Sequence, residues 1–214
     1  GWGKYSNQTS IESKEFYRCI LSKHWLHSVR DRYTEKKCLE MGFKNVIFTA
    51  CPTMWKLTPE FCKTIPHDKN EEMDRKMIQI LRKNYRKLYF WAQGTGDVQY
   101  LSELGEKTED IVIIDSLEQY TNLLKNQKID FVGVRLHAGI HALNNQRRTI
   151  IIAIDNRAIE MGKDTKLPIV LRDEIENKLE KMINSSFETK IEIPTDNINK
   201  WKAQYGASDG IPLL

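Results

Sequence analysis

The chain has 214 residues, enough for one large domain, and 40% of them are hydrophobic, which suffices for a substantial core. Its formal charge of +4 is small for this length and gives no reason to expect a nucleic-acid partner. No apolar run approaches the roughly 18 residues that span a bilayer. The four cysteines lack the CxxC spacing of zinc sites. We therefore expect a cytoplasmic protein whose thiols stay reduced.

The first quarter of the chain contains two predicted helices and one predicted strand. The apolar spacing indicates a helix over Ile11–Trp25 and a second helix over Thr34–Met41. A short extended segment, Leu26–Arg30, lies between them. The β-branched run Asn45–Ala50 predicts a strand, and a turn over Cys51–Trp55 follows it.

The rest of the chain alternates apolar runs with amphipathic segments. Four further strands are predicted, at Leu88–Trp91, Ile111–Ile114, Ile129–Val134 and Thr149–Ile154. Helices are predicted at Glu71–Asn84, Val98–Leu104, Leu117–Asn126, Leu136–Asn145, Asp173–Asn184 and Asn197–Gln204. This alternation indicates an α/β fold, with a parallel sheet that carries helices on both faces. Ligands of such sheets bind beyond the carboxyl ends of the strands, so we expect a site at the loops that follow Trp91, Ile114, Val134 and Ile154.

The residues Arg135, Leu136 and His137 stand where a predicted strand ends and a predicted helix begins. A helix N-terminus offers free N–H groups and a partial positive charge, which suit a phosphate or a carboxylate. Arg135 adds a planar fork that fits a carboxylate, and His137 adds a group that exchanges a proton near neutral pH. The alternative is that Arg135 pairs with a carboxylate of the sheet and His137 only caps the helix.

Two other arginines are candidate substrate-binding residues. Arg157 follows the most apolar strand, where a ligand at the strand ends would meet it, and Arg30 ends the extended segment before the second helix. His137 and His141 lie four residues apart on one helical face, but no third ligand accompanies them. We therefore expect no metal site and assign His141 to helix packing.

Five blocks of sequence, taken together, resemble the polysaccharide pyruvyl transferase family. They are, in chain order, His27-Ser28-Val29-Arg30-Asp31, Thr49-Ala50-Cys51-Pro52-Thr53-Met54-Trp55, Tyr89-Phe90-Trp91-Ala92-Gln93-Gly94, Val134-Arg135-Leu136-His137-Ala138-Gly139 and Ile154-Asp155-Asn156-Arg157-Ala158. The resemblance runs through nearly the whole chain, and its most telling part is the fourth block, on the strand–helix junction.

The resemblance implies a Rossmann-like half of a GT-B-like architecture, in which two such halves face a cleft. Members of the family transfer pyruvate from phosphoenolpyruvate to sugar hydroxyls as a ketal, in the synthesis of bacterial capsules and exopolysaccharides. The residues that match the family's donor contacts are Arg30, Arg135, Leu136 through its backbone, and His137, the candidate catalytic acid. The implied partners are phosphoenolpyruvate and a saccharide or lipid-linked saccharide acceptor, which would allow a peripheral association with a membrane. The scheme requires neither a cofactor nor a metal.

Two alternative functions, from other classes of protein, stay open. One is a sugar-nucleotide glycosyltransferase of the same fold, because a fold does not fix a function, and Glu160 or Asp173 would then bind the nucleotide. The other is a non-catalytic binding domain that has kept the architecture.

The sequence departs from the family pattern in two places. It begins with Gly1, about where the second half of the family begins, so we expect a missing amino-terminal half. We divide the chain into a hinge or linker helix over residues 1–26, a Rossmann-like donor-binding domain over 27–195 and a tail helix over 196–214. The family pattern also has a strand and loop before Glu71, where Thr64–Asn70 contains no apolar strand, and we expect a break in the chain there.

Overall fold

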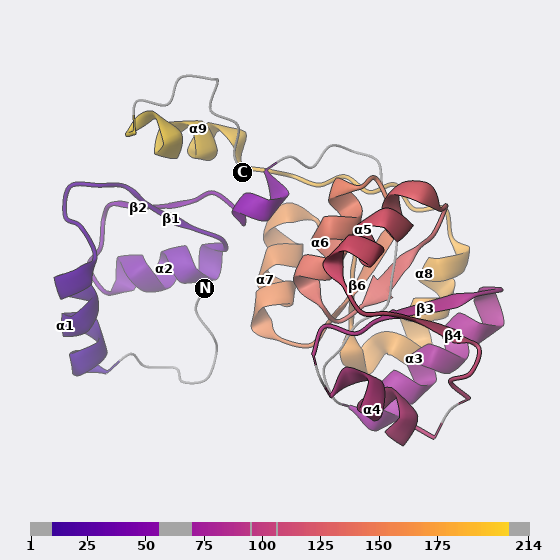
Figure 1. Ribbon diagram of the computed structural model, residues 1–214. Coiled ribbons are helices and arrows are strands. Elements are labelled where there is room, and N and C mark those ends of the chain that lie inside the picture. Colours follow the sequence, from indigo (N-terminus) through magenta and orange to yellow (C-terminus); the bar gives the residue numbers. More distant parts are fainter. Residues whose placement is uncertain (1–9, 56–69, 95, 106, 206–214) are drawn as a thin grey trace.

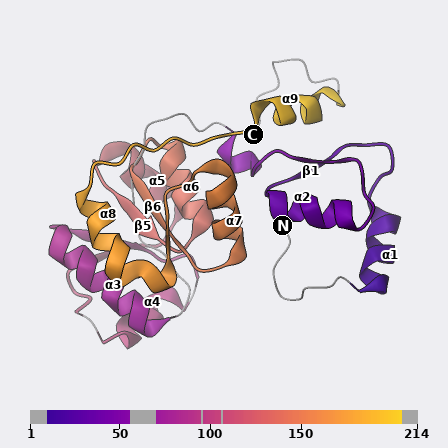
Figure 2. The ribbon, with the colours of Figure 1, turned by 180° about the vertical axis from the view of Figure 1, so that it is seen from behind.

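The computed structural model of the chain describes residues 10–55, 70–94, 96–105 and 107–205. Figure 1 shows a small amino-terminal body beside a larger body that holds most of the helices and strands, and Figure 2 shows the two bodies from behind. None of the described helices is both long and apolar enough to cross a membrane.

The small body is built from two helices and two parallel strands. These are α1 (Ile11–Ile20), β1 (His27–Val29), α2 (Arg32–Glu40) and β2 (Val46–Phe48). Asp31 begins α2 because its carboxylate accepts a hydrogen bond from the Thr34 N–H at 2.6 Å. Gly42 follows the helix at a φ of 93°, a left-handed conformation that glycine adopts without strain. The buried cluster of this body consists of Cys38, Met41 and Val46.

In the described residues, the larger body contains five strands, and each pairing between them is parallel. They are β3 (Leu88–Trp91), β4 (Ile111–Ile114), β5 (Phe131–Gly133), β6 (Thr149–Ala153) and β7 (Ile169–Leu171). The hydrogen bonds join β3 to β4 and, separately, β5 to β6 to β7. The helices are α3 (Glu71–Asn84), α4 (Asp97–Glu103), α5 (Leu117–Asn126), α6 (Leu136–Asn144), α7 (Asn156–Thr165) and α8 (Glu180–Asn184). Two short helical turns, η2 (Arg172–Glu174) and η3 (Ile175–Leu179), lead into α8.

Helices cover both faces of these strands, and β6 shows why. Its five residues are all buried, and they alternate between two apolar clusters. Ile151 packs into the cluster formed with α5, α6 and α7, whereas Ile150 packs into the cluster formed with α3, α4 and η3. A strand buried on both faces requires a continuous apolar run, which is the pattern that the sequence carries here.

The chain finally returns to the small body. Helix α9 (Thr195–Ala203) packs on β2, and Asn197 Nδ2 donates to the Phe48 carbonyl at 2.8 Å. The Gln204 side chain accepts from the Leu26 N–H at 2.6 Å and donates to the Leu26 carbonyl at 2.8 Å. Helix α9 therefore lies beside β1 and β2 in both views, apart from the other helices (Figure 1).

The structure confirms the parallel α/β class and the predicted strands, whose ends differ from the expected ones by at most two residues. The strands form three hydrogen-bonded groups instead of one continuous sheet. Strand β7 and helix α7 were not predicted. The first helix was predicted too long, because the chain turns to an extended conformation at Leu21.

The predicted domain boundaries stay a prediction, although the range 27–195 includes strands of both bodies. The expected break before Glu71 falls on residues 56–69, which lie outside the described residues.

Candidate functional site

A polar cavity of about 330 Å³ lies at the carboxyl ends of β5 and β6, the edge at which parallel sheets bind ligands. Its walls come from Gln93 after β3, from residues 134–138 at the junction of β5 and α6, and from residues 154, 155, 157 and 158 at the junction of β6 and α7. Four of the predicted site residues therefore share one cavity: Arg135, Leu136, His137 and Arg157.

The N-terminus of α6 is open, whereas that of α7 is already capped. Arg135 occupies the N-cap position of α6, and its side chain accepts no hydrogen bond from the first turn. The residues of that turn, Leu136, His137 and Ala138, all line the cavity. At α7, the Asp155 carboxylate accepts from the backbone N–H groups of the first turn. An anion in this cavity would thus find free N–H donors at α6 and not at α7.

Arg135 is anchored by one long contact and keeps hydrogen-bonding capacity. Its Nη2 lies 3.4 Å from Asp97 Oδ2, which is longer than a normal hydrogen bond. Asp97 is buried, and the same oxygen accepts from the Gln93 N–H at 2.9 Å and the Gly94 N–H at 3.0 Å. Among the described residues, Arg135 Nε is buried without a hydrogen-bond partner. A buried donor left unsatisfied costs about 1–3 kcal/mol.

His137 is exposed to the cavity, and its ring faces Cys51, which is buried in the core of the larger body. Its Nε2 lies 3.7 Å from Cys51 Sγ, and Thr53 Oγ1 lies 3.1 Å from the same sulfur. Burial alone raises the pKa of the Cys51 thiol, but the hydrogen bonds with His137 and Thr53 outweigh it and bring the pKa to about 7. The resemblance placed Cys51 in a family block, but its contact with His137 was not predicted.

The position of α6 depends on a glycine and a tyrosine. A Cβ atom on Gly139 would lie 2.8 Å from Ile151 Cγ1, so only glycine lets α6 approach β6 this closely. Tyr120, fully buried on α5, donates its hydroxyl to the Ala138 carbonyl at 3.0 Å and stacks on Trp91. These contacts fix the first turn of α6, and with it the donors that border the cavity.

The other two predicted substrate-binding residues, Arg157 and Arg30, differ in whether they reach the cavity. Arg157 lines the cavity, but its guanidinium pairs with Asp155, and Nε lies 2.7 Å from Asp155 Oδ2. Arg30 does not line this cavity; its Nε lies 3.6 Å from Asp31 Oδ2 in the small body. Their roles as substrate-binding residues stay predictions.

His141 faces α5, where its Nε2 lies 3.0 Å from Thr121 Oγ1, in keeping with a packing role. In the described part of the chain, no three His, Cys, Asp or Glu side chains are grouped as a metal site. Glu160 and Asp173, the carboxylates considered for a nucleotide, do not line the cavity, and Glu160 pairs with Lys163 at 3.0 Å.

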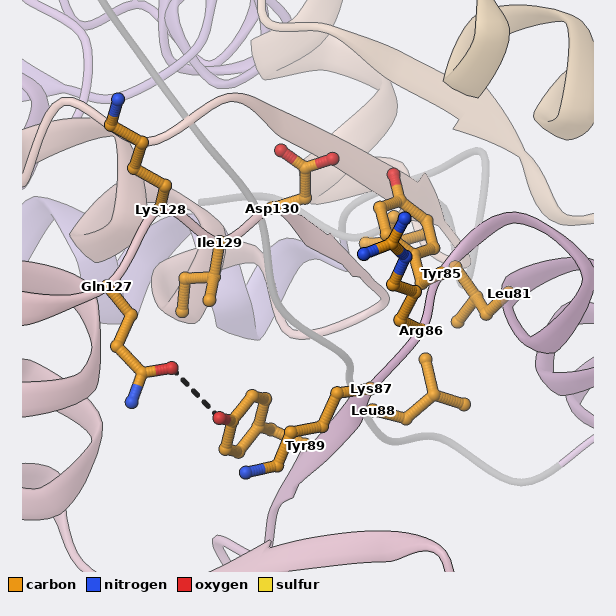
Figure 3. Close-up of a pocket in the computed structure, with 11 residues that line it drawn as sticks. Leu81, Tyr85, Arg86, Lys87, Leu88, Tyr89, Gln127, Lys128, Ile129 and Asp130 are labelled. Carbon is orange, nitrogen blue, oxygen red and sulfur yellow. Dashed lines mark hydrogen bonds between the residues drawn. The ribbon is translucent and has the colours of Figure 1, made fainter.

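A second cavity of about 330 Å³ lies at the opposite edge, where β3 and β5 begin (Figure 3). It is bordered by the cationic side chains of Arg86, Lys87 and Lys128, and Tyr89 donates to Gln127 across its mouth at 2.9 Å. Among the described helices, none begins at this edge, because the helices of a parallel α/β fold begin at the carboxyl ends of the strands. We therefore place the candidate site at the α6 cavity.

Sequence reasoning missed Asp97 and Gln93 as parts of the site. Asp97 follows Gly94 by three residues, and a Cβ at Gly94 would lie 3.0 Å from Asp97 Oδ1. A glycine-rich turn followed by an aspartate at a helix start is the signal that could have indicated this carboxylate-bridged loop. The contact of Cys51 with His137 joins residues 86 positions apart, and no local pattern reveals it.

Comparisons with known proteins give a family match and a weak structural likeness. The sequence model of the family described as polysaccharide pyruvyl transferase matches residues 2–156. No curated protein matches the chain significantly. Among solved structures, the chain is similar to the one titled "Crystal structure of LpCGTa in complex with UDP", at 14% identity and a TM-score of 0.37. That likeness covers 78% of this chain and 44% of the other, so this chain spans less than half of that protein.

Proposed function

Because this chain, matched over residues 2–156, belongs to the polysaccharide pyruvyl transferase family, we propose that it binds phosphoenolpyruvate in the α6 cavity and takes part in pyruvyl transfer to a saccharide. One observation carries the proposal. The uncapped first turn of α6, the half-buried Arg135 and the exposed His137 all line one cavity. This set can hold an anion and exchange a proton with it.

Phosphoenolpyruvate carries a phosphate and a carboxylate on a three-carbon enol, so it needs two cationic clamps at a fixed distance. The phosphate fits the free N–H groups of α6, since these donors and the helix dipole favour a compact anion. The carboxylate fits the fork of Arg135. Arg157 in the same cavity, or Arg30 in the small body, supplies the further cation.

The reaction that this arrangement serves begins with a proton. Protonation of the enol carbon makes the neighbouring carbon electrophilic, and a sugar hydroxyl adds to it. Phosphate leaves with the electrons of its C–O bond, and a second hydroxyl of the sugar closes the ketal with loss of its proton. His137 is the acid of this scheme, and a positioned acid accelerates a reaction by about 10²–10⁴-fold.

Ligand-dependent thermal unfolding of the intact protein tests the proposal. Phosphoenolpyruvate at about 100 times its Kd should stabilise the protein by about 2.7 kcal/mol. Pyruvate and inorganic phosphate, added separately, should stabilise it less, because each satisfies only one of the two clamps. Stabilisation by a nucleotide sugar without any effect of phosphoenolpyruvate would instead support the glycosyltransferase reading, and no response to either would support a binding domain with another ligand.

A turnover assay completes the test. Intact protein, phosphoenolpyruvate and a panel of saccharides should release inorganic phosphate together with an acid-labile pyruvate ketal. Phosphate release that does not depend on a saccharide would contradict transfer to a sugar.

A further inference from the structure

We propose that Cys51 and His137 share one proton as a thiolate–imidazolium pair, and that Cys51 is the positioning residue that keeps His137 able to donate a proton. The proton sharing is a property of the chain itself, whereas its use in catalysis rests on the proposed function. The pair joins Cys51, which directly precedes the short turn η1 (Pro52–Met54), to the first turn of α6, and both segments pack in the larger body.

The geometry holds the thiol against the ring. Cys51 is 8% exposed, and its Sγ lies 3.7 Å from His137 Nε2 and 3.1 Å from Thr53 Oγ1. The Met54 N–H donates to the Cys51 carbonyl at 2.8 Å, and Asn144 Nδ2 of α6 donates to the Thr53 carbonyl at 2.9 Å. Helix α6 and the turn are therefore joined by two contacts, the Cys51–His137 contact and the Asn144–Thr53 hydrogen bond, and the second keeps the turn next to His137.

Two groups that can donate a hydrogen bond lie next to one buried sulfur and favour its thiolate form. A thiol is a weak donor and a weak acceptor, but a thiolate accepts hydrogen bonds from both an imidazolium and a hydroxyl. The proton that leaves Sγ adds to the ring of His137, so the pair as a whole stays neutral. Burial opposes an isolated charge at this position, but it penalises a neutral contact pair far less.

The charges around the pair come from the cavity. Arg135, Arg157 and Asp155 line the cavity with His137. In the part of the chain that the structure describes, His137 is the ionisable side chain whose charge acts on the Cys51 thiol. The ring is the natural acceptor of the cysteine proton, because no other base contacts that sulfur among these residues.

The pair determines which nitrogen delivers the proton. In the ionised pair, Nε2–H of His137 donates to the sulfur, which leaves Nδ1–H for the substrate. The described residues provide no partner for Nδ1, and the ring borders the cavity. After Nδ1 has given up its proton, the thiolate still holds the ring in place through Nε2–H, so the ring can be protonated again from solvent.

The absorbance of the thiolate at 240 nm tests the sharing without any substrate. We expect the component that Cys51→Ser removes to titrate with a midpoint near pH 7 in the wild-type protein. In His137→Ala the same component should move up by about one pH unit or more, toward the value of about 8.5 for an ordinary thiol. Cys38→Ser is the matched control, because Cys38 is also buried, lies away from any described histidine contact and has a pKa raised by burial. Its removal should leave the component near pH 7 intact. Identical midpoints in wild type and His137→Ala would overturn the proposal.

The pH dependence of turnover tests the role in catalysis. An acid loses activity as the pH rises through its deprotonation, and Cys51→Ser removes the anion that favours protonated His137. The alkaline limb of the kcat profile should therefore move to lower pH in Cys51→Ser. An unmoved alkaline limb would overturn the catalytic role. If the thiolate titrates as expected but no saccharide is pyruvylated, the proposed function fails while the proton sharing stands.

Discussion

Replacement of Arg135 by alanine should weaken phosphoenolpyruvate binding more than any other arginine change in the described cavity. The structure sets the size of the effect. Arg135 Nη2 makes a 3.4 Å contact with Asp97, and the Arg135 side chain is 37% exposed, so part of its guanidinium remains accessible to the ligand. A hydrogen bond to a charged group contributes about 1.5–3 kcal/mol. Because each 1.4 kcal/mol is tenfold, the Kd should rise by about 10- to 150-fold.

Isothermal titration calorimetry on the intact protein measures this change. Arg135→Lys should recover only part of the loss, since an ammonium cannot form the two-point contact of a guanidinium. Arg82→Ala is the matched control, because Arg82 pairs with Asp110 at 2.7 Å on the other side of the fold and should leave the Kd unchanged. Each variant must be folded at the temperature of the titration, which its thermal unfolding curve will establish. A Kd for Arg135→Ala within about twofold of wild type would refute the assignment of the donor carboxylate to Arg135.

Two further substitutions test how the fold holds the site. Gly139→Ala should lower the free energy of unfolding by about 1–3 kcal/mol and weaken donor binding, because the added methyl group meets Ile151 and displaces α6 from β6. Gly96→Ala, where a Cβ meets no atom within 4 Å, should cost less than about 1 kcal/mol, and equal losses in the two urea unfolding curves would contradict the packing argument. Asp74→Ala should cost about 3 kcal/mol, because it leaves Arg172 without the carboxylate that it contacts at 3.0 Å through both oxygens. The donor Kd should not change in Asp74→Ala, and an unfolding loss below about 1 kcal/mol, the range of a surface ion pair, would contradict the buried-pair argument.

The strands could be predicted because each is an apolar run that both faces of a parallel sheet must bury. In β6, for example, Ile150 and Ile151 are both fully buried, on opposite faces. The grouping of the strands could not be predicted, since the hydrogen bonds between strands depend on how the helices pack. In the structure, β3 and β5 are not hydrogen-bonded to each other, and the residue patterns of the two strands do not reveal this.

Helix α7 was missed although its buried residues follow the helical spacing. Ala158, Met161, Gly162 and Thr165 are the buried positions, at intervals of three, four and seven residues. Gly162 hid the pattern because glycine disfavours helix interiors. Tertiary packing explains the glycine at this position. A Cβ at Gly162 would lie 2.6 Å from Ile169 Cδ1, so the glycine lets α7 lie close to β7.

The site could be predicted only in its local part. Arg135, Leu136 and His137 follow from one strand–helix junction, and the structure brings them to one cavity with Arg157. The contact of His137 with Cys51 joins two segments that are far apart in the sequence, and it depends on how η1 packs against α6. Such contacts between distant segments follow from the packing of whole elements and leave no periodic signal in the sequence.

The central claim is that the first turn of α6 binds the donor, and amide chemical shifts in a ¹H–¹⁵N correlation spectrum test it most directly. On titration with phosphoenolpyruvate, the N–H resonances of Leu136, His137 and Ala138 should shift the most and saturate with one common Kd. In Arg135→Ala the same three resonances should need about 10- to 150-fold more donor to reach half-saturation. Unmoved α6 amides together with shifts at Gln127 and Lys128, around the opposite cavity of Figure 3, would contradict the account.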